Sequence, residues 1–431
     1  MITTVAAAGD IFMTRRLPDV PYPGEAALAE FLRNFDVRFA NLEITVHDRE
    51  GSPGAVSGGT WAMAHPGILK DLRRIPFNVW NAANNHALDY SHDGLLATLR
   101  HLEDADMRYA GIGRNLADAS APVYIETPAA RVAMIAAVST CPDFWMAGQQ
   151  RIDMRGRPGV NKLRYVTDYH VTPVQLAALK EMAGPLYINA AHDSSVREGF
   201  EAPDEGFYRF GTMRFIEDSV TETRTSPNAA DLARITASVR EAKRQADLVL
   251  VSIHAHETYK GDKEQPAEFL RTFAHACVDA GASAILGHGP HILRGIELYN
   301  GAPIFYSLGN FLFENDTTTH QPADFYGKYR LDPLTATSGM GMDARSHDDT
   351  IGLSRDPRVW ESVVPCMTFE NTRLVSLTLQ PVEMGFELPR YRKGLPVLSR
   401  DMSVIERLAK LSSPFGTKIS ADGETGRVVL P

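Results

Sequence analysis

The amino-acid sequence predicts an α/β protein in which short buried strands alternate with helices. Near-continuous apolar runs, such as Asp247–Ile253, have the composition of strands that are buried on both faces. Segments with helical spacing, such as Ala229–Gln245, lie between these runs. Polar residues such as Asp10 stand directly after several of the runs. Strands and helices that alternate in this way are typical of layered α/β folds.

The first third of the chain alternates most regularly. It opens with a short apolar strand, Thr3–Ala8, that ends at a Gly-Asp pair. The further elements expected here are helix Gly24–Asn34, strand Val37–Ala40, helix His65–Arg74, strand Phe77–Ala82, helix Ser91–Asp104 and strands Arg108–Gly111 and Arg131–Val138. Ser91 is the expected N-cap of its helix, because a hydroxyl can accept a hydrogen bond from a first-turn N–H group.

The middle of the chain shows little periodicity. Cys141–Tyr169 is rich in Arg, Gly and Pro, and Ile188–Ser226 is polar. Between them, Thr172 and Pro173 open the helix Thr172–Ala183, with proline at its first position. We therefore expect residues 141–226 to form an irregular insertion over the site and not a separate domain.

Regular structure is expected to resume at residue 227. The predicted elements are helix Ala229–Gln245, strand Asp247–Ile253, helix Gln265–Ala280, strands Ala284–Gly287, Ile292–Leu298 and Pro303–Leu308, a hairpin of Val363–Thr368 and Leu374–Leu379, and helix Asp401–Leu411. Residues 314–357 are polar and aperiodic, as in a lid, a binding loop or a disordered segment. We expect a single domain over residues 1–383 and a C-terminal helix and hairpin extension over residues 384–431.

The bulk composition excludes several classes of protein. The chain has 431 residues, of which 44% are hydrophobic and 23% charged, so it can bury a sizeable core. A net charge of −9 without basic runs argues against nucleic acid as a partner. Three distant cysteines do not make a disulfide framework. Neither a signal-peptide pattern nor an apolar run long enough for a membrane span is present, so we expect a cytoplasmic enzyme.

Side chains that can bind metal follow the expected strands, at the point where each strand ends. They are Asp10, Glu43, Asn85, His86, Asp89, His254, His256, His288 and His291. In open α/β sheets, ligands bind outside the carboxyl ends of the strands, so these side chains should share one rim. Imidazole suits zinc, iron or manganese, and oxygen ligands favour manganese, magnesium or calcium. The absence of a nearby thiolate argues against a structural zinc site.

Five sequence blocks resemble the CapA, or poly-γ-glutamate (capsule) synthesis, family, a branch related to the calcineurin-like metallophosphoesterases. In order, they are GDIFMTRRL, NLEITV, NNHALD, VSIHAHETY and GHGPHILRGIELYNGAPIFYSLGNFLF, and they span Gly9–Phe313. The last block is the most specific, because GHxPH and YSLGNFLF occur at the separation typical of the family. The resemblance implies a metallophosphoesterase-like layered β-sandwich flanked by helices, in the order α/β/β/α.

The resemblance also implies the roles of single residues. The implied metal ligands are Asp10, Glu43, Asn85, His254, His288 and His291. His86 would act on the leaving group, and Asp89, three residues later, is expected to orient its imidazole. The usual Asp-x-His start is Asp10-Ile11-Phe12 here, and the final histidine pair is spaced by an extra residue. We therefore expect one firmly held ion (manganese, zinc or iron) and a weaker second ion, with His256 available to replace the missing imidazole.

These features predict a metal-dependent hydrolase that uses metal-activated water. Its expected substrate is small and acidic: a phosphate ester, or an amide or ester bond of γ-glutamyl type. Two alternatives remain open, namely a non-catalytic accessory protein that binds poly-γ-glutamate and an amidase or peptidase-like offshoot of the same fold. Among other polar residues, Asn310 could line the site or cap a turn, and the turn is favoured. Arg294 could meet a carboxylate or phosphate of the substrate, and pairing at the surface is the default.

Overall fold

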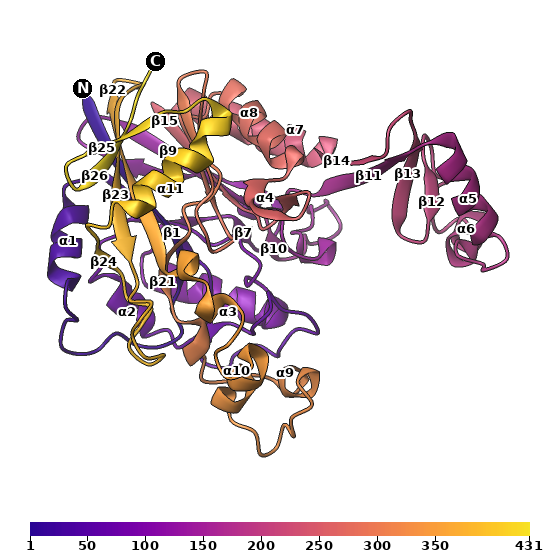
Figure 1. Cartoon of the computed structure of the whole chain (residues 1–431), viewed down its shortest axis with the longest axis horizontal. Coiled ribbons are helices and arrows are strands. Elements are labelled where there is room, and N and C mark those ends of the chain that lie inside the picture. The colour runs from indigo at the N-terminus through magenta and orange to yellow at the C-terminus, as the bar shows by residue number, and fades with distance from the viewer.

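The structure is a computed structural model that describes all residues, 1–431. It confirms the predicted mixed α/β class, with two large sheets, several small ones and helices packed against them (Figure 1). The ten-stranded sheet has the order β25-β26-β23-β22-β1-β2-β5-β6, with β21 beside β1 and β24 beside β23. Its strands are β1 (Ile2–Phe12), β2 (Val37–Leu42), β5 (Val79–Asn81), β6 (Tyr109–Ala110), β21 (Asn310–Phe313), β22 (Glu361–Glu370), β23 (Arg373–Glu383), β24 (Val397–Leu398), β25 (Ile419–Asp422) and β26 (Thr425–Val428).

The second large sheet has six strands in the order β19-β20-β18-β15-β9-β8. They are β8 (Val123–Glu126), β9 (Arg131–Val138), β15 (Leu248–His254), β18 (Ala284–His288), β19 (Ile296–Tyr299) and β20 (Ala302–Phe305). Three two-stranded pairs complete the body: β3 (Thr45–Val46) with β4 (Met63–Ala64), β7 (Ile112–Gly113) with β10 (Gly159–Val160), and β16 (Thr258–Tyr259) with β17 (Asp262–Pro266).

The two large sheets face each other across a shared core. Alternate residues of a strand point to opposite faces, so Ala7 of β1 and Met134 of β9 lie in this central core. Their neighbours Ala8 and Ile135 lie in two outer cores. Helices α1 (Glu25–Arg33), α2 (Ile68–Leu72) and α3 (Ser91–Asp104) cover the ten-stranded sheet, and α7 (Ala229–Gln245) and α8 (Glu268–Asp279) cover the six-stranded sheet. This packing fixes both sets of strand ends at one rim.

Several predicted elements occur with the expected bounds, but one predicted cap is wrong. Helix α5 (Pro173–Ala183) is capped by Thr172, whose hydroxyl and the side chain of Gln175 form a reciprocal capping box. Ser91, in contrast, is the first residue of α3 and makes no capping hydrogen bond. Its φ of 56° places it in the left-handed region, and Tyr90 occupies the N-cap position. The strand ends that carry the site were more predictable than this turn.

The segment predicted to be irregular contains a sheet of its own. Strands β12 (Tyr208–Phe210), β13 (Met213–Glu217), β11 (Tyr165–Val171) and β14 (Glu222–Pro227) pair in that order. Together with α5 and α6 (Ala190–Arg197) they form an arm, residues 165–227, that projects from the body (Figure 1). Only Val171, Leu176 and Ala183 of the arm are buried. Because both faces of its sheet are partly exposed, the sequence has no apolar alternation that would reveal the strands.

Residues 314–357 also contain regular structure where a structureless loop was predicted. Helices α9 (Ala323–Lys328) and α10 (Ser338–Ser346) lie here, and their aromatic and methionine side chains pack with Trp61 and Tyr90 in a small separate core. These helices are short and polar, which hides their period.

Two further helices belong to the body. Helix α4 (Leu116–Ser120) packs beside β7, and α11 (Ser403–Ser412) packs on the central core before the hairpin β25–β26. None of the helices combines the length and apolar character that crossing a membrane requires.

Candidate metal centre

The first group of potential metal ligands joins both sheets. Asp10 lies near the end of β1, and His254 and His288 are paired at the ends of the neighbouring strands β15 and β18. One ligand atom from each of the three lies within 4.8 Å of the others. All three side chains are buried. The predicted convergence of these strand ends is therefore present in the structure.

The second group lies beside the first and consists of Glu43, His256 and His291, again within 4.8 Å of one another. His254 links the two groups, because its Nδ1 is 3.0 Å from Nδ1 of His288 and its Nε2 is 3.0 Å from Nε2 of His256. Imidazole nitrogens that share an ion at about 2.0–2.1 Å lie roughly this close together. The cluster thus has the donor set and spacing of a divalent metal site.

Glu43 provides the clearest sign that a cation belongs here. Its carboxylate is fully buried, yet neither oxygen has a hydrogen-bond partner. Burial, together with the negative charges of Asp10 and Asp89, raises the pKa of Glu43 well above its usual range. Asn85 likewise has a buried Oδ1 without a partner. Buried acceptors are costly when unpaired, and a bound cation would satisfy them.

The neighbouring groups have the protonation states that ligation requires. Burial lowers the pKa of His254 and His256, and it lowers the pKa of His291 to about 4, so these imidazoles are neutral at pH 7. Burial alone would raise the pKa of Asp10. The hydrogen bond and charge of His288, the charge of His291 and the amide of Asn41 outweigh it, and the pKa is lowered.

Four polar residues that the sequence analysis did not assign to the site hold the ligands in place. Asn41 donates to Asp10 Oδ1 at 2.7 Å, and Asn81 donates to Asn41 Oδ1 at 2.6 Å. The hydroxyl of Ser252 lies 2.7 Å from Nε2 of His288. Asn310, expected to cap a turn, lies in β21, and its Oδ1 accepts from Nδ1 of His291 at 2.9 Å. This contact leaves Nε2 of His291 free to face Glu43.

His86 and Asp89 make the predicted contact. Nδ1 of His86 is 2.6 Å from Oδ2 of Asp89, and the buried carboxylate also accepts from the backbone N–H groups of Gly58 and Ala62. Nε2 of His86 lies 3.9 Å from Glu43 Oε1. Phe12, which stands where the family's imidazole is missing, packs edge-on against the His86 ring at 5.1 Å between centroids. It supplies no ligand atom but restricts the ring.

Arg294 is fully buried instead of pairing at the surface, so that expectation was wrong. Its guanidinium donates to the carbonyl oxygens of Lys263 at 3.0 Å and His256 at 3.1 Å. Burial lowers its pKa to about 10, and no carboxylate forms an ion pair with it. Arg294 therefore fixes the backbone of the loop that carries His256.

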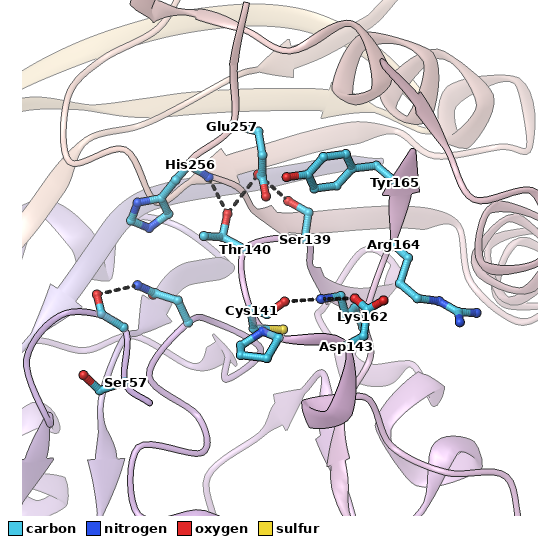
Figure 2. Close-up of a pocket in the computed structure, with 13 residues that line it drawn as sticks. Ser57, Ser139, Thr140, Cys141, Asp143, Lys162, Arg164, Tyr165, His256 and Glu257 are labelled. Carbon is cyan, nitrogen blue, oxygen red and sulfur yellow. Dashed lines mark hydrogen bonds and ion pairs between the residues drawn. The ribbon is translucent and has the colours of Figure 1, made fainter. Parts of the chain in front are cut away.

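A polar cavity of about 580 Å³ opens beside the metal centre (Figure 2). Its lining residues are Ser57, Gly58, Asn85, Ser139, Thr140, Cys141, Pro142, Asp143, Lys162, Arg164, Tyr165, His256 and Glu257. Because Asn85 and His256 are both lining residues and candidate metal ligands, one side of the cavity lies at the metal centre. Lys162 and Glu257 were not predicted as site residues, because neither stands directly after a strand of the two large sheets.

The fold and the cluster define a protein with an α/β body and a candidate metal centre at its strand ends. The sequence profile of the family "Bacterial capsule synthesis protein PGA_cap" matches residues 4–315, and the chain belongs to this family. This confirms the predicted resemblance.

Individual relatives extend this comparison. The chain is 35% identical to an uncharacterized protein of Sinorhizobium fredii over 99% of the chain and 93% of that protein. It is 27% identical to the capsule biosynthesis protein CapA of Bacillus anthracis over 73% of the chain and 61% of that protein. It is 26% identical to a probable polyglutamine synthesis accessory protein of Mycobacterium tuberculosis over 70% of the chain and 62% of that protein.

Proposed function

We propose that this protein is a metal-dependent hydrolase of a small acidic substrate. The observation that carries the proposal is the buried carboxylate of Glu43, which lacks any hydrogen-bond partner and faces neutral imidazoles. The proposed ligands are Asp10, Glu43, Asn85, His254, His256, His288 and His291. The proposed ion is manganese, zinc or iron, with one ion held firmly and a second held more weakly.

The fold supports the same proposal. Two facing sheets with helices on both outer sides have the order α/β/β/α, and we propose that this is the metallophosphoesterase-like arrangement. In this scheme residues 1–383 form one domain. Residues 141–226 are its insertion, residues 314–357 are its long peripheral segment, and residues 384–431 are a C-terminal extension.

A divalent ion in this centre would lower the pKa of a bound water and so supply the nucleophile. The chain's own residues would do the rest. Asp89 accepts the Nδ1 proton of His86, which fixes the tautomer and the direction of the ring. In its imidazolium form, which the Asp89 carboxylate stabilises, His86 would give its Nε2 proton to the leaving group and be left as the Nδ1–H tautomer. Phe12 limits the ring's freedom to turn away. Neutral His254 and the carboxylate of Asp10 would be among the residues that hold the ion.

The bond that is broken is either a phosphate ester or an amide or ester of γ-glutamyl type. The names of the Bacillus and Mycobacterium relatives place them in capsule or polyglutamine synthesis, which supports an acidic, glutamyl-like substrate. The Mycobacterium name also supports the second candidate, an accessory protein that binds polymer without catalysis. An amidase-like or peptidase-like activity of the same centre is the third.

Elemental analysis of the purified protein tests the proposal, together with a panel of phosphoesters and γ-glutamyl amides assayed with manganese, zinc or iron. We expect a bound divalent ion that is lost in His254→Ala and in His291→Ala, and turnover that depends on it. The matched control is His320→Ala, because His320 is exposed and belongs to neither group of potential ligands. Protein that binds no metal and is activated by none of the three ions would refute the hydrolase. Polymer binding that survives both His86→Ala and metal removal would favour the accessory role.

A further inference from the structure

The cavity beside the metal centre contains a buried positive charge. The side chain of Lys162 is only 4% exposed, and its ammonium pairs with Asp143 Oδ1 at 2.8 Å. The ammonium also donates to the carbonyl of Cys141, so two of its three N–H groups have protein acceptors. Both residues line the cavity, and the side chain of Asp143 is 77% exposed.

The same cavity contains a fixed carboxylate without a cationic partner. Glu257 Oε2 accepts from the hydroxyls of Ser139 at 2.7 Å and Thr140 at 2.9 Å (Figure 2). Neither a lysine nor an arginine forms a salt bridge with Glu257, although the charge of the buried Arg294 acts on it from a greater distance, and its Oε1 has no hydrogen-bond partner. The Thr140 hydroxyl also accepts from the backbone N–H of His256 at 2.7 Å. These hydrogen bonds therefore fix the position of the Glu257 carboxylate relative to the loop that carries His256, a proposed metal ligand.

The two charges lie close enough to act on the same small molecule. Both line one cavity, and three consecutive residues hold them: the hydroxyls of Ser139 and Thr140 donate to Glu257, and the carbonyl of Cys141 accepts from Lys162. Arg164 adds a second cation at the Lys162 end, although its Nε and Nη2 atoms are engaged by Asp231. A phosphate monoester would gain from Lys162 but would be repelled by Glu257 and Asp143. A chemical group with one positive and one negative charge can pair with both Lys162 and Glu257.

We infer that this cavity binds an α-amino-acid end of the substrate, with its carboxylate at Lys162 and its ammonium at Glu257. The inference rests on the proposed function, because it takes the cavity as the substrate site of that centre. The scissile bond then points toward His256 and Asn85 at the metal side of the cavity. Among the substrate classes considered above, an amide or ester with a free amino-acid end is favoured over a phosphate ester.

Three p-nitroanilides separate the two charges. γ-Glutamyl-p-nitroanilide, as both enantiomers, carries the carboxylate and the ammonium; glutaryl-p-nitroanilide lacks the ammonium; and 4-aminobutyryl-p-nitroanilide lacks the carboxylate. The same contrast is measured without chemistry by calorimetric titration of the metal-loaded protein with three primary amides: glutamine, glutaramate, which lacks the ammonium, and 4-aminobutanamide, which lacks the carboxylate. We expect wild-type protein to bind glutamine about tenfold or more tightly than either partner compound, because each partner compound loses one charged hydrogen-bonding group.

Two variants assign the charges to residues. Lys162→Met should weaken the binding of glutamine and glutaramate by about tenfold and leave that of 4-aminobutanamide unchanged. Glu257→Gln should weaken the binding of glutamine and 4-aminobutanamide and leave that of glutaramate unchanged. Glu257→Gln keeps an acceptor for both hydroxyls and so preserves the wall. The matched controls are Lys70→Met and Glu30→Gln, whose exposed side chains make neither salt bridges nor side-chain hydrogen bonds.

The outcomes separate this assignment from the proposed hydrolysis. Equal affinities for the three ligands would overturn the assignment, as would a Lys162→Met variant that weakens all three alike because the lysine only anchors the Asp143 turn. Turnover of an anilide in that case would leave the hydrolase intact. Conversely, charge-selective binding that both variants abolish, without turnover of any substrate, would overturn the hydrolase and sustain the binding site.

Discussion

Replacing Glu43 by glutamine should stabilise the metal-free protein and abolish its response to metal. The Glu43 carboxylate is buried without a hydrogen bond, and burial and the charges of Asp10 and Asp89 raise its pKa. Without metal, the folded protein loses free energy here, either because ionised Glu43 is repelled by Asp10 and Asp89 or because Glu43 has to take up a proton. Glutamine has no charge and takes up no proton, so it removes both costs. We expect a gain of about 1–3 kcal/mol in the free energy of unfolding, because each unit by which burial and neighbouring charges raise a carboxyl pKa corresponds to about 1.4 kcal/mol.

The wild-type protein should gain stability when metal is added. At free metal a thousandfold above the dissociation constant, linkage gives about 4 kcal/mol. Thermal unfolding with chelator and with manganese or zinc measures both effects. Glu43→Gln should begin with a higher Tm than wild type and show no further rise.

A second buried carboxylate provides the control with the opposite sign. Asp231 accepts hydrogen bonds from the backbone and side chain of Arg164. Burial alone would raise its pKa, but these bonds and the charges of Arg164 and Arg234 lower it. Asp231→Asn should therefore lower the Tm while keeping the metal-induced rise. The reasoning is wrong if Glu43→Gln destabilises the metal-free protein as Asp231→Asn does, or if it still responds to metal.

Three further predictions address the positioning residues and the pH response. Asp89→Asn should lower kcat about 10–100-fold without loss of metal, since the Asp89 carboxylate hydrogen-bonds to His86, Gly58 and Ala62 and to none of the proposed ligands; a parallel loss of metal would contradict this role. Arg294→Met should weaken metal about tenfold in a chelator competition, because it frees the carbonyl of His256; unchanged affinity would exclude a positioning role. Burial lowers the pKa of His47 to about 4, and its Nδ1 accepts from the N–H of Glu50. Between pH 6.5 and 4 the unfolded chain binds a proton here that the folded chain does not, so stability falls as pH falls through this window. His47→Asn keeps the acceptor, and urea unfolding at pH 7 and 5 should show a smaller loss on acidification than wild type; an equal loss would exclude His47 as a source.

The proposed metal ligands could be found in the sequence because each stands next to a local signal in the chain. His254 closes an apolar run, and Asp10 follows another, so the end of a buried strand marks both. The residues that support them carry no such mark. Asn41 and Asn81 are polar residues within strands, and only the pairing of Asp10 with Asn41, and of Asn41 with Asn81, brings them together. The local periodicity of a sequence does not show how strands from distant segments pair with one another.

The cavity residues and the arm escaped prediction for a related reason. Glu257 is fixed in the cavity wall by hydrogen bonds from the hydroxyls of Ser139 and Thr140, which lie more than a hundred residues earlier in the chain. The arm's strands alternate charged and apolar residues weakly because neither face of its sheet meets a deep core. Helix α5 was found with its correct start because capping is local: Thr172, Pro173 and Gln175 lie within four consecutive positions.

The way in which the arm is attached has a consequence for how this chain can diversify. Tyr165 and Pro227, the first and last residues of the arm, face each other as paired neighbours in β11 and β14. Tyr165 also stacks on Phe269 of α8 with 4.3 Å between ring centroids, so the junction itself is anchored to the body. Everything beyond this junction leaves and returns at one point without crossing any strand of the two large sheets (Figure 1). One contiguous stretch of the gene thus encodes the whole arm. The arm can be lengthened, shortened or exchanged without changing the order in which the strands of the two large sheets are connected.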